Sequence, residues 1–160
     1  MVDYTKTVIY TIRCIDKNIT DLYVGSTCNF ISRKTQHKSR CNTENRHGYN
    51  YHIYKVIRAN GGWDNWIMTP YEEYKECTSI LQCRIREEHV RRGLNANLNT
   101  HQAYSTIDEK REQINLNNSV YNANPIICPC GKYYTYRNKI RHMNTKQHCQ
   151  FLLNNPTVII

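Results

Sequence analysis

The sequence contains no long apolar run. No stretch approaches the ~20 consecutive apolar residues that a membrane-spanning helix needs, so a membrane partner is not expected. Residues 1–6 are polar and the apolar run that follows is short, which is unlike a secretory signal. These features predict a non-secreted, intracellular protein, whether cytoplasmic, nuclear or virus-encoded.

Acidic residues are also scarce. The 160 residues include 13 Asp and Glu against 22 Lys and Arg, which gives a formal net charge of +9. Although many basic proteins bind no polyanion, this excess favours nucleic acid as a partner. A chain of this length can hold one catalytic-size domain and a small module.

Cysteine is abundant, with eight residues. Without a secretory signal, such a set indicates reduced thiols, some of them metal ligands, rather than a disulfide framework.

The N-terminal part begins with two β-rich runs, residues 8–14 and 22–25, each with a tyrosine in the middle. Their alternation places Tyr10 with Ile12 on one strand face, and Tyr23 with Gly25 on one face of the next. The polar residues 16–21 between them predict a hairpin connection.

A helix is expected to begin after Asn29, which is a suitable N-cap. Phe30, Arg33 and His37 follow at steps of three and four, so they share one helix face. The sequence therefore predicts two phenols, a guanidinium and an imidazole near one another.

Further elements are expected downstream. Residues 49–60 have helical apolar spacing and end at two glycines. Residues 66–74 predict a third strand, in which Pro70 requires an edge position or a bulge.

The segment 78–94 predicts a helix whose narrow apolar stripe includes Cys83 and Val90. Glu87 lies on that stripe, where a carboxylate is costly unless it pairs with an arginine or coordinates a metal. Glu88 lies further round the helix and is the competing candidate.

Residues 105–125 are rich in Asn, Asp, Glu and Lys, and predict a tether with a short possible helix at 107–116. The segment CPCGKYYTYRNKIRHMNTKQH follows at 128–148. Two thiolates and two imidazoles would suit tetrahedral zinc. A segment so short cannot bury enough apolar area to fold alone, so a bound metal is expected to stabilise it. The candidate ligands are Cys128, Cys130, His142 and His148. Only Pro129 separates the two cysteines, and Cys149 is an alternative ligand.

The motifs VIY at 8–10 and YVG at 23–25 resemble the paired motifs of the GIY-YIG nucleases. Arg33 and His37 resemble the next motif of that family, and Arg86-Glu87 followed by Leu98-Asn99 resembles the later one. Val8 stands where the family usually has glycine. The resemblance covers about residues 7–104, and residues 54–66 resemble members from large DNA viruses and mobile elements.

The resemblance implies an α/β (α+β) domain with a three-stranded antiparallel sheet, the first strand central, flanked by helices. It implies a Mg2+ or Mn2+ ion at Glu87, with Asn99 beside the site as a cofactor-binding residue. Arg33 would grip the scissile phosphate, and Tyr10 would be the favoured base, assisted by Tyr23 and His37. From the chemistry of the residues alone, either Tyr10 or His37 could take the proton of the attacking water.

These observations predict a GIY-YIG nuclease domain at 5–104, a linker at 105–125 and a C2H2-like zinc finger at 126–153. The expected function is metal-dependent DNA endonuclease activity, with Zn2+ in a finger that aids DNA binding. A catalytically inactive nucleic-acid-binding protein on the same fold and a zinc-finger RNA-binding factor are the alternatives. The DNA specificity, the biological role and the oligomeric state stay open.

Overall fold

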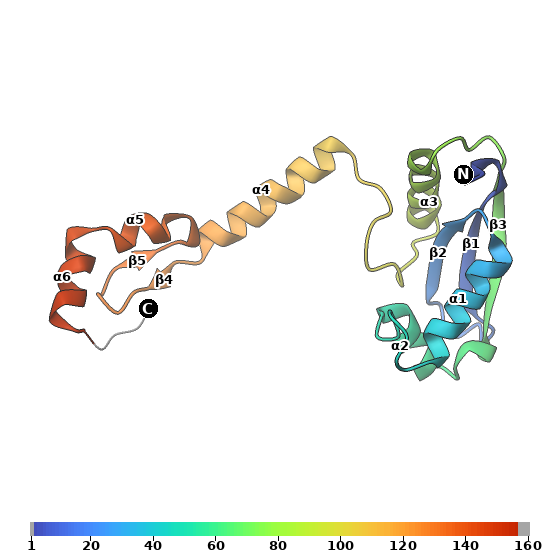
Figure 1. Cartoon of the computed structure of the whole chain (residues 1–160), viewed down its shortest axis with the longest axis horizontal. Coiled ribbons are helices and arrows are strands. Elements are labelled where there is room, and N and C mark those ends of the chain that lie inside the picture. The colour runs from blue at the N-terminus through green and yellow to red at the C-terminus, as the bar shows by residue number, and fades with distance from the viewer. Residues whose placement is uncertain (1, 157–160) are drawn as a thin grey trace. The chain divides into compact units, whose positions relative to one another are not determined.

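The computed structural model describes residues 2–156, and the chain divides into two compact units, up to Tyr104 and from Ser105 onward. Figure 1 shows the elements of each unit, and each unit is treated by itself below. Among residues 2–156, no helix combines the length and the apolar character that a bilayer crossing requires.

The N-terminal unit is built on a three-stranded antiparallel sheet of order β2-β1-β3, with β1 central as expected. The strands are β1 (Thr7–Cys14), β2 (Leu22–Thr27) and β3 (Trp66–Tyr74). Tyr10 pairs with Gly25 on one side and with Pro70 on the other. The register shifts between Ile9 and Tyr10, so the proline lies at an irregularity of an edge strand, where a missing N–H is tolerated.

Helices cover the sheet. They are α1 (Phe30–Asn42), α2 (His52–Ala59) and α3 (Ile80–Gly93), and Figure 1 shows α1 crossing the sheet and α3 beside β2. Asn29 caps α1 as expected, since its side chain accepts from the Ser32 N–H at 3.0 Å. Short 3-10 turns occur at Tyr4–Lys6 and Trp63–Asn65.

Strand alternation divides the core in two. Tyr10 and Ile12 pack on one face of the sheet with Tyr54 and Ile57 of α2. Ile9 packs on the opposite face with Val24 of β2 and Val90 of α3. The alternation expected from the sequence is confirmed, and it delivers Tyr10 and Tyr23 to the α1 and α2 side.

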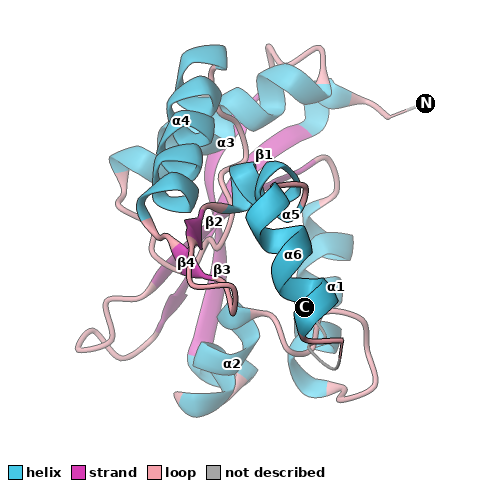
Figure 2. Ribbon diagram, turned by 90° about the vertical axis from the view of Figure 1, so that its left-hand side faces the viewer, coloured by secondary structure: helices cyan, strands magenta, loops and turns pink. Residues whose placement is uncertain are grey.

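The C-terminal unit begins with α4 (Ile107–Ala123), a continuous helix that Figure 2 shows in cyan with the shorter α5 and α6. The short helix expected at 107–116 is therefore longer than predicted, and most of the segment 105–125 is helical. Thr106 and Glu109 form a capping box, in which each side chain accepts from the other residue's N–H. This closure satisfies backbone donors at the helix start, so a segment poor in apolar residues still forms a helix.

After α4 the chain forms a β-hairpin and two short helices. These are β4 (Ile126–Ile127), β5 (Tyr133–Tyr134), a 3-10 turn (Tyr136–Asn138), α5 (Lys139–Met143) and α6 (Lys146–Asn154). The hairpin turn carries the CPCG sequence, and Gly131 at its end has a φ of +81°, a value that favours glycine.

Candidate active site and Cys-His cluster

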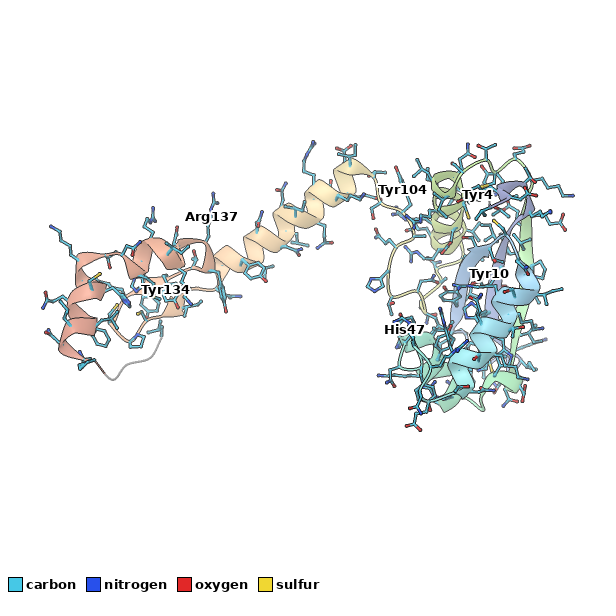
Figure 3. The ribbon with its side chains drawn as sticks, in the orientation of Figure 1. Tyr4, Tyr10, His47, Tyr104, Tyr134 and Arg137 are labelled. Atoms are coloured by element: carbon cyan, nitrogen blue, oxygen red, sulfur yellow. The ribbon has the colours of Figure 1, made fainter. Side chains whose placement is uncertain are left out.

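Tyr10 of β1 lies at the centre of a hydrogen-bonded group, and Figure 3 marks its position. The Tyr10 hydroxyl is 2.8 Å from His37 Nε2 and accepts from Arg33 Nε at 2.9 Å. Arg33 and His37 are one helical turn apart on α1, so both side chains reach the same phenol. The structure therefore brings together three of the residues predicted from the sequence.

The close approach of β2 to Tyr10 depends on Gly25. A Cβ atom built at Gly25 would overlap the Tyr10 hydroxyl. The glycine of the YVG motif is thus explained by packing against the phenol of the paired strand. Val8, the departure from the first motif, pairs with Thr27 and takes no part in this contact.

The Tyr10 and His37 side chains are deeply buried. Burial, aided by the cations Arg33 and Arg40, lowers the pKa of His37 to about 3. Burial is also the main cause that raises the pKa of Tyr10, with the neighbouring Tyr23 adding to it. Both groups are therefore neutral at neutral pH in the free protein.

A cavity of about 290 Å³ opens beside this group and is lined by Tyr23, Arg33, His37, Glu87 and Asn99, among others. Tyr23 is partly exposed, whereas Tyr10 is closed to solvent. The cavity thus joins four of the five candidate catalytic residues with Asn99, and Tyr10 lies behind its wall.

Glu87 belongs to α3, which packs on the face of the sheet that carries Ile9 and Val24, and its side chain contacts β2. Ser26, just after the YVG motif, donates to Glu87 Oε2 at 2.5 Å. Burial raises the pKa of Glu87, while the Ser26 hydrogen bond and the Arg33 charge oppose that rise. Among the described residues, no ion pair joins this carboxylate to Arg84 or Arg91; the Arg84 charge makes only a small contribution to its pKa, and Arg91 pairs with Glu88.

Glu88 makes the arginine pairs instead. It accepts from Arg91 at 2.7 and 2.9 Å, from Arg92 at 2.7 Å and from the Ala103 N–H at 3.0 Å. Burial works to raise its pKa, but these hydrogen bonds outweigh burial and hold the pKa at about 2. Glu88 therefore anchors the segment after α3, and Glu87 is the glutamate on the cavity wall.

Asn99 lies beside the site, but its amide is engaged with β2. Asn99 Oδ1 accepts from the Val24 N–H at 3.0 Å, and Nδ2 donates to the Val24 carbonyl at 2.7 Å. This pair of bonds resembles one step of a strand ladder. It fixes the strand that carries Tyr23 and Gly25.

Three residues of the site were not singled out from the sequence: Ser26, Arg40 and Tyr54. Tyr54 of α2 lies 2.9 Å from His37 Nδ1 and is almost fully buried. In the sequence, Tyr54 belongs only to the helical apolar spacing of residues 49–60, together with Ile53 and Ile57. No local pattern joins residues 37 and 54, because their contact depends on the packing of two helices.

The four candidate zinc ligands meet in the C-terminal unit. One ligand atom from each of Cys128, Cys130, His142 and His148 lies within 4.8 Å of the others. The Sγ to imidazole nitrogen distances are 3.4 Å for Cys128–His148 and 3.5 Å for Cys130–His142. Tetrahedral zinc with ordinary bond lengths places a sulfur and a nitrogen ligand about 3.5 Å apart. Cys149 is exposed and lies outside the cluster.

This cluster is also the interior of the unit. Among the C-terminal side chains that the structure describes, those classed as buried are Cys128, His142 and His148. Ile140, an obvious apolar candidate for a small core, is 78% exposed. His148 Nε2 is buried and has no hydrogen-bond partner among the described residues. Polar ligand atoms in place of an apolar core fit a metal-held module.

Comparison with known proteins agrees with the N-terminal geometry. The model of the GIY-YIG catalytic domain matches residues 6–102, so the chain belongs to this nuclease family. No curated protein and no solved structure matches the chain. The family assignment thus stands on the domain that contains Tyr10, Tyr23, Arg33, His37 and Glu87.

Proposed function

We propose that the protein is a metal-dependent DNA endonuclease whose C-terminal zinc finger aids DNA binding. The observation that carries the proposal is the phenol of Tyr10, bonded to both Arg33 and His37 behind a cavity that Glu87 also lines. The family match makes this cavity the expected place for phosphodiester hydrolysis. The excess of basic residues supports a nucleic-acid substrate.

Glu87 is the residue proposed to hold a divalent cation. Ser26 donates to one oxygen of this carboxylate, Oε2, and the other oxygen can face a cation. A single carboxylate suits Mg2+ or Mn2+, which keep several water ligands. When bound, such a cation supplies Lewis acidity at a phosphate oxygen. Ser26 orients the Glu87 carboxylate, and Asn99 acts as a positioning residue that fixes β2 rather than as a metal ligand.

Arg33 is proposed to bind the scissile phosphate with its planar guanidinium. In the free protein, the Arg33 Nε–H is directed at the Tyr10 hydroxyl. Substrate binding would draw Arg33 toward the phosphate and open the phenol oxygen to the cavity. Such a movement would let the closed phenol meet a water molecule only after the substrate has entered.

The proposed proton path runs from water to Tyr10 and from Tyr10 to His37. Water gives a proton to the Tyr10 oxygen as the hydroxide forms a bond to phosphorus, and the Tyr10 proton moves to His37 Nε2. The bond from phosphorus to the leaving oxygen breaks, its electron pair stays on that oxygen, and a solvent water molecule then protonates it. An anionic phosphodiester beside His37 raises the pKa of the imidazole, which favours this transfer.

In the C-terminal unit, Cys128, Cys130, His142 and His148 are proposed to hold Zn2+, a closed site that stabilises the fold. Five basic residues and no acidic residue follow Ala123, which supports contact with the DNA backbone. They are Lys132, Arg137, Lys139, Arg141 and Lys146.

The test is incubation with supercoiled plasmid in the presence or absence of Mg2+ or Mn2+. The wild-type protein is expected to nick the plasmid only with metal, and Glu87→Gln is expected to be inactive. Glu44→Gln is the matched control, because Glu44 is exposed and lies outside the cavity. A folded wild-type protein that binds DNA but leaves it intact across these metals would support the inactive binding protein instead. Cleavage of RNA in preference to DNA would also contradict the proposal.

A further inference from the structure

We propose that Tyr54 is a positioning residue that holds the proton of His37 on Nδ1, so that the lone pair of Nε2 faces Tyr10. The inference deepens the proposed function and rests on it for its catalytic consequence. It concerns the second hydrogen bond of the imidazole, on the side away from Tyr10. The assignment follows from the directions of three hydrogen bonds.

The direction of the hydrogen bond between Tyr10 and His37 is fixed by Arg33. A guanidinium N–H can only donate, so the Tyr10 oxygen accepts at Arg33. The Tyr10 hydroxyl is then directed at its other neighbour, His37 Nε2, 2.8 Å away. His37 Nε2 therefore accepts and carries no proton.

The direction of the hydrogen bond between His37 and Tyr54 follows because the imidazole is neutral. A neutral ring has one protonated nitrogen, which must be Nδ1 if Nε2 accepts. Nδ1 lies 2.9 Å from the Tyr54 hydroxyl, and the Arg40 guanidinium also donates to the Tyr54 oxygen. A phenol oxygen has two lone pairs, so the Tyr54 oxygen is the acceptor for the Nδ1 proton as well as for Arg40. Removal of this oxygen would leave a buried donor without a partner, which is costly.

Packing keeps this arrangement rigid. Tyr54 is 1% exposed and His37 is 2% exposed, so water does not readily replace the phenol. The Trp63 ring lies parallel to the imidazole, with an interplanar angle of 9° and centroids 6.2 Å apart. The ring of His37 is thereby held between helices, and the hydroxyl of Tyr54 selects which nitrogen carries the proton.

The consequence concerns the proton of Tyr10. With the proton on Nδ1, Nε2 can receive the phenol proton as Tyr10 takes one from water. With the proton on Nε2, the imidazole would donate a hydrogen bond to the Tyr10 oxygen, and Nε2 could not receive the phenol proton. Tyr54 would thus act on the reaction through His37.

Tyr54→Phe tests this role, because it removes one oxygen atom and leaves the ring that fills the core. Tyr49→Phe is the matched control, since the Tyr49 ring packs under Arg58 and lies outside the cavity. Nitrogen-15 NMR of the imidazoles reports which nitrogen carries the proton. A His37→Gln sample identifies the signal among the seven histidines.

We expect wild-type His37 to be protonated on Nδ1, and the Nε2-protonated form to become populated in Tyr54→Phe only. The kcat for plasmid nicking should fall on the order of 10- to 100-fold, the range known for partners that orient metal-ligating histidines, with KM unchanged. Tyr49→Phe should alter neither the tautomer nor kcat.

Three results would overturn the inference: an Nε2-protonated His37 in the wild type, an unchanged tautomer in folded Tyr54→Phe, or a changed tautomer with an unchanged kcat. The tautomer is measured without substrate or metal. Absence of cleavage by the wild type would therefore refute the nuclease proposal while the NMR result still decides the hydrogen-bond assignment.

Discussion

At the scale of residues, the side chains proposed to act on the reacting phosphate differ from those expected to supply most of the DNA affinity. Arg33 and Glu87 are proposed to act on the reacting phosphate, whereas DNA affinity would be spread over many Lys and Arg side chains. We therefore expect Arg33→Ala and Glu87→Ala to lower the nicking rate by on the order of 100-fold or more while DNA binding is nearly retained. Plasmid nicking and fluorescence anisotropy with labelled DNA measure the two effects.

Arg13→Ala is a suitable control for the loss of a positive charge, because Arg13 is exposed at the far end of β1 and does not line the cavity. It should leave cleavage intact. If Glu88→Gln rather than Glu87→Gln removed the metal dependence, the assignment of the two glutamates would be reversed.

Glu88 supports a prediction about stability. Its pKa is lowered from 4.5 to about 2 by its arginine partners and the Ala103 N–H, so its stabilising effect is complete above the unfolded value. The effect is lost as the pH falls from about 4.5 through about 2. At pH 7, Glu88→Gln should lower the free energy of unfolding by about 3 kcal/mol.

Urea unfolding of the wild type and of Glu88→Gln at several pH values would measure this difference. The gap between the two proteins should narrow as the pH falls below about 4.5 and nearly close near pH 2. Glu44→Gln, at an exposed position, provides the baseline. A gap that stays constant with pH would contradict the proposed ion pairing.

The two glutamates also show what the sequence could determine. Spacing placed Glu87 on the sheet side of α3, and the resemblance placed it in the site. Neither could show that Glu88 would be the more buried of the two. Its burial depends on Arg91, Arg92 and the backbone of Ala103, a segment that folds back after the helix.

At the scale of elements, the sheet was the most predictable part. The alternation in β1 and β2, the Asn29 cap and the proline in β3 are local signals, and each has the expected structure. The contact between Tyr54 and His37 was not predictable, because α1 and α2 meet through tertiary packing. The length of α4 was underestimated because its many Asn residues hide the helical pattern.

The capping box of α4 gives a prediction at this scale. Thr106→Ala removes the side-chain oxygen that accepts from the Glu109 N–H at 3.1 Å. The first turn should then fray, with a loss of about 1 kcal/mol in local stability. Hydrogen exchange of the amides near the helix start should accelerate.

Ser119→Ala serves as the control within α4, because Ser119 lies in the interior of the helix and is exposed. It should leave exchange at the helix start unchanged. Equal exchange in Thr106→Ala and the wild type would show that the capping box does not hold the helix start.

At the scale of the whole molecule, the two units are expected to depend on different metals. The purified protein should contain about one zinc ion, and Cys130→Ser or His142→Ala should reduce that content. Because the described buried side chains of the C-terminal unit are the candidate ligands, chelation of zinc should also unfold this unit. Metal analysis and amide NMR of the two units would measure both effects.

Cys149→Ser is the control, since Cys149 is exposed and outside the cluster. A chain that ends at Tyr104 keeps the Ala103 contact with Glu88 and the whole cavity. It should therefore retain slow cleavage with weaker DNA binding. A folded but inactive chain of this length, or intact protein without zinc, would contradict the division of roles.

The last prediction concerns the salt dependence of DNA binding. Each phosphate neutralised by Lys or Arg releases counterions, so the affinity should fall steeply as salt rises. Lys139 and Arg141 of α5 are exposed, and no acidic residue lies in the sequence after Ala123. If both contact phosphates, Lys139→Gln with Arg141→Gln should reduce the slope of log K against log salt by about 2.

A second pair of cations provides the control. Lys110 and Arg111 lie in the first part of α4 among three acidic residues, and Arg111 is 3.4 Å from Asp108. Their positive charge is locally offset, so Lys110→Gln with Arg111→Gln should leave the slope nearly unchanged. Equal slopes for the two double variants would mean that net charge, and not a specific surface on α5, governs binding. A flat salt profile in the wild type would argue against a nucleic-acid partner altogether.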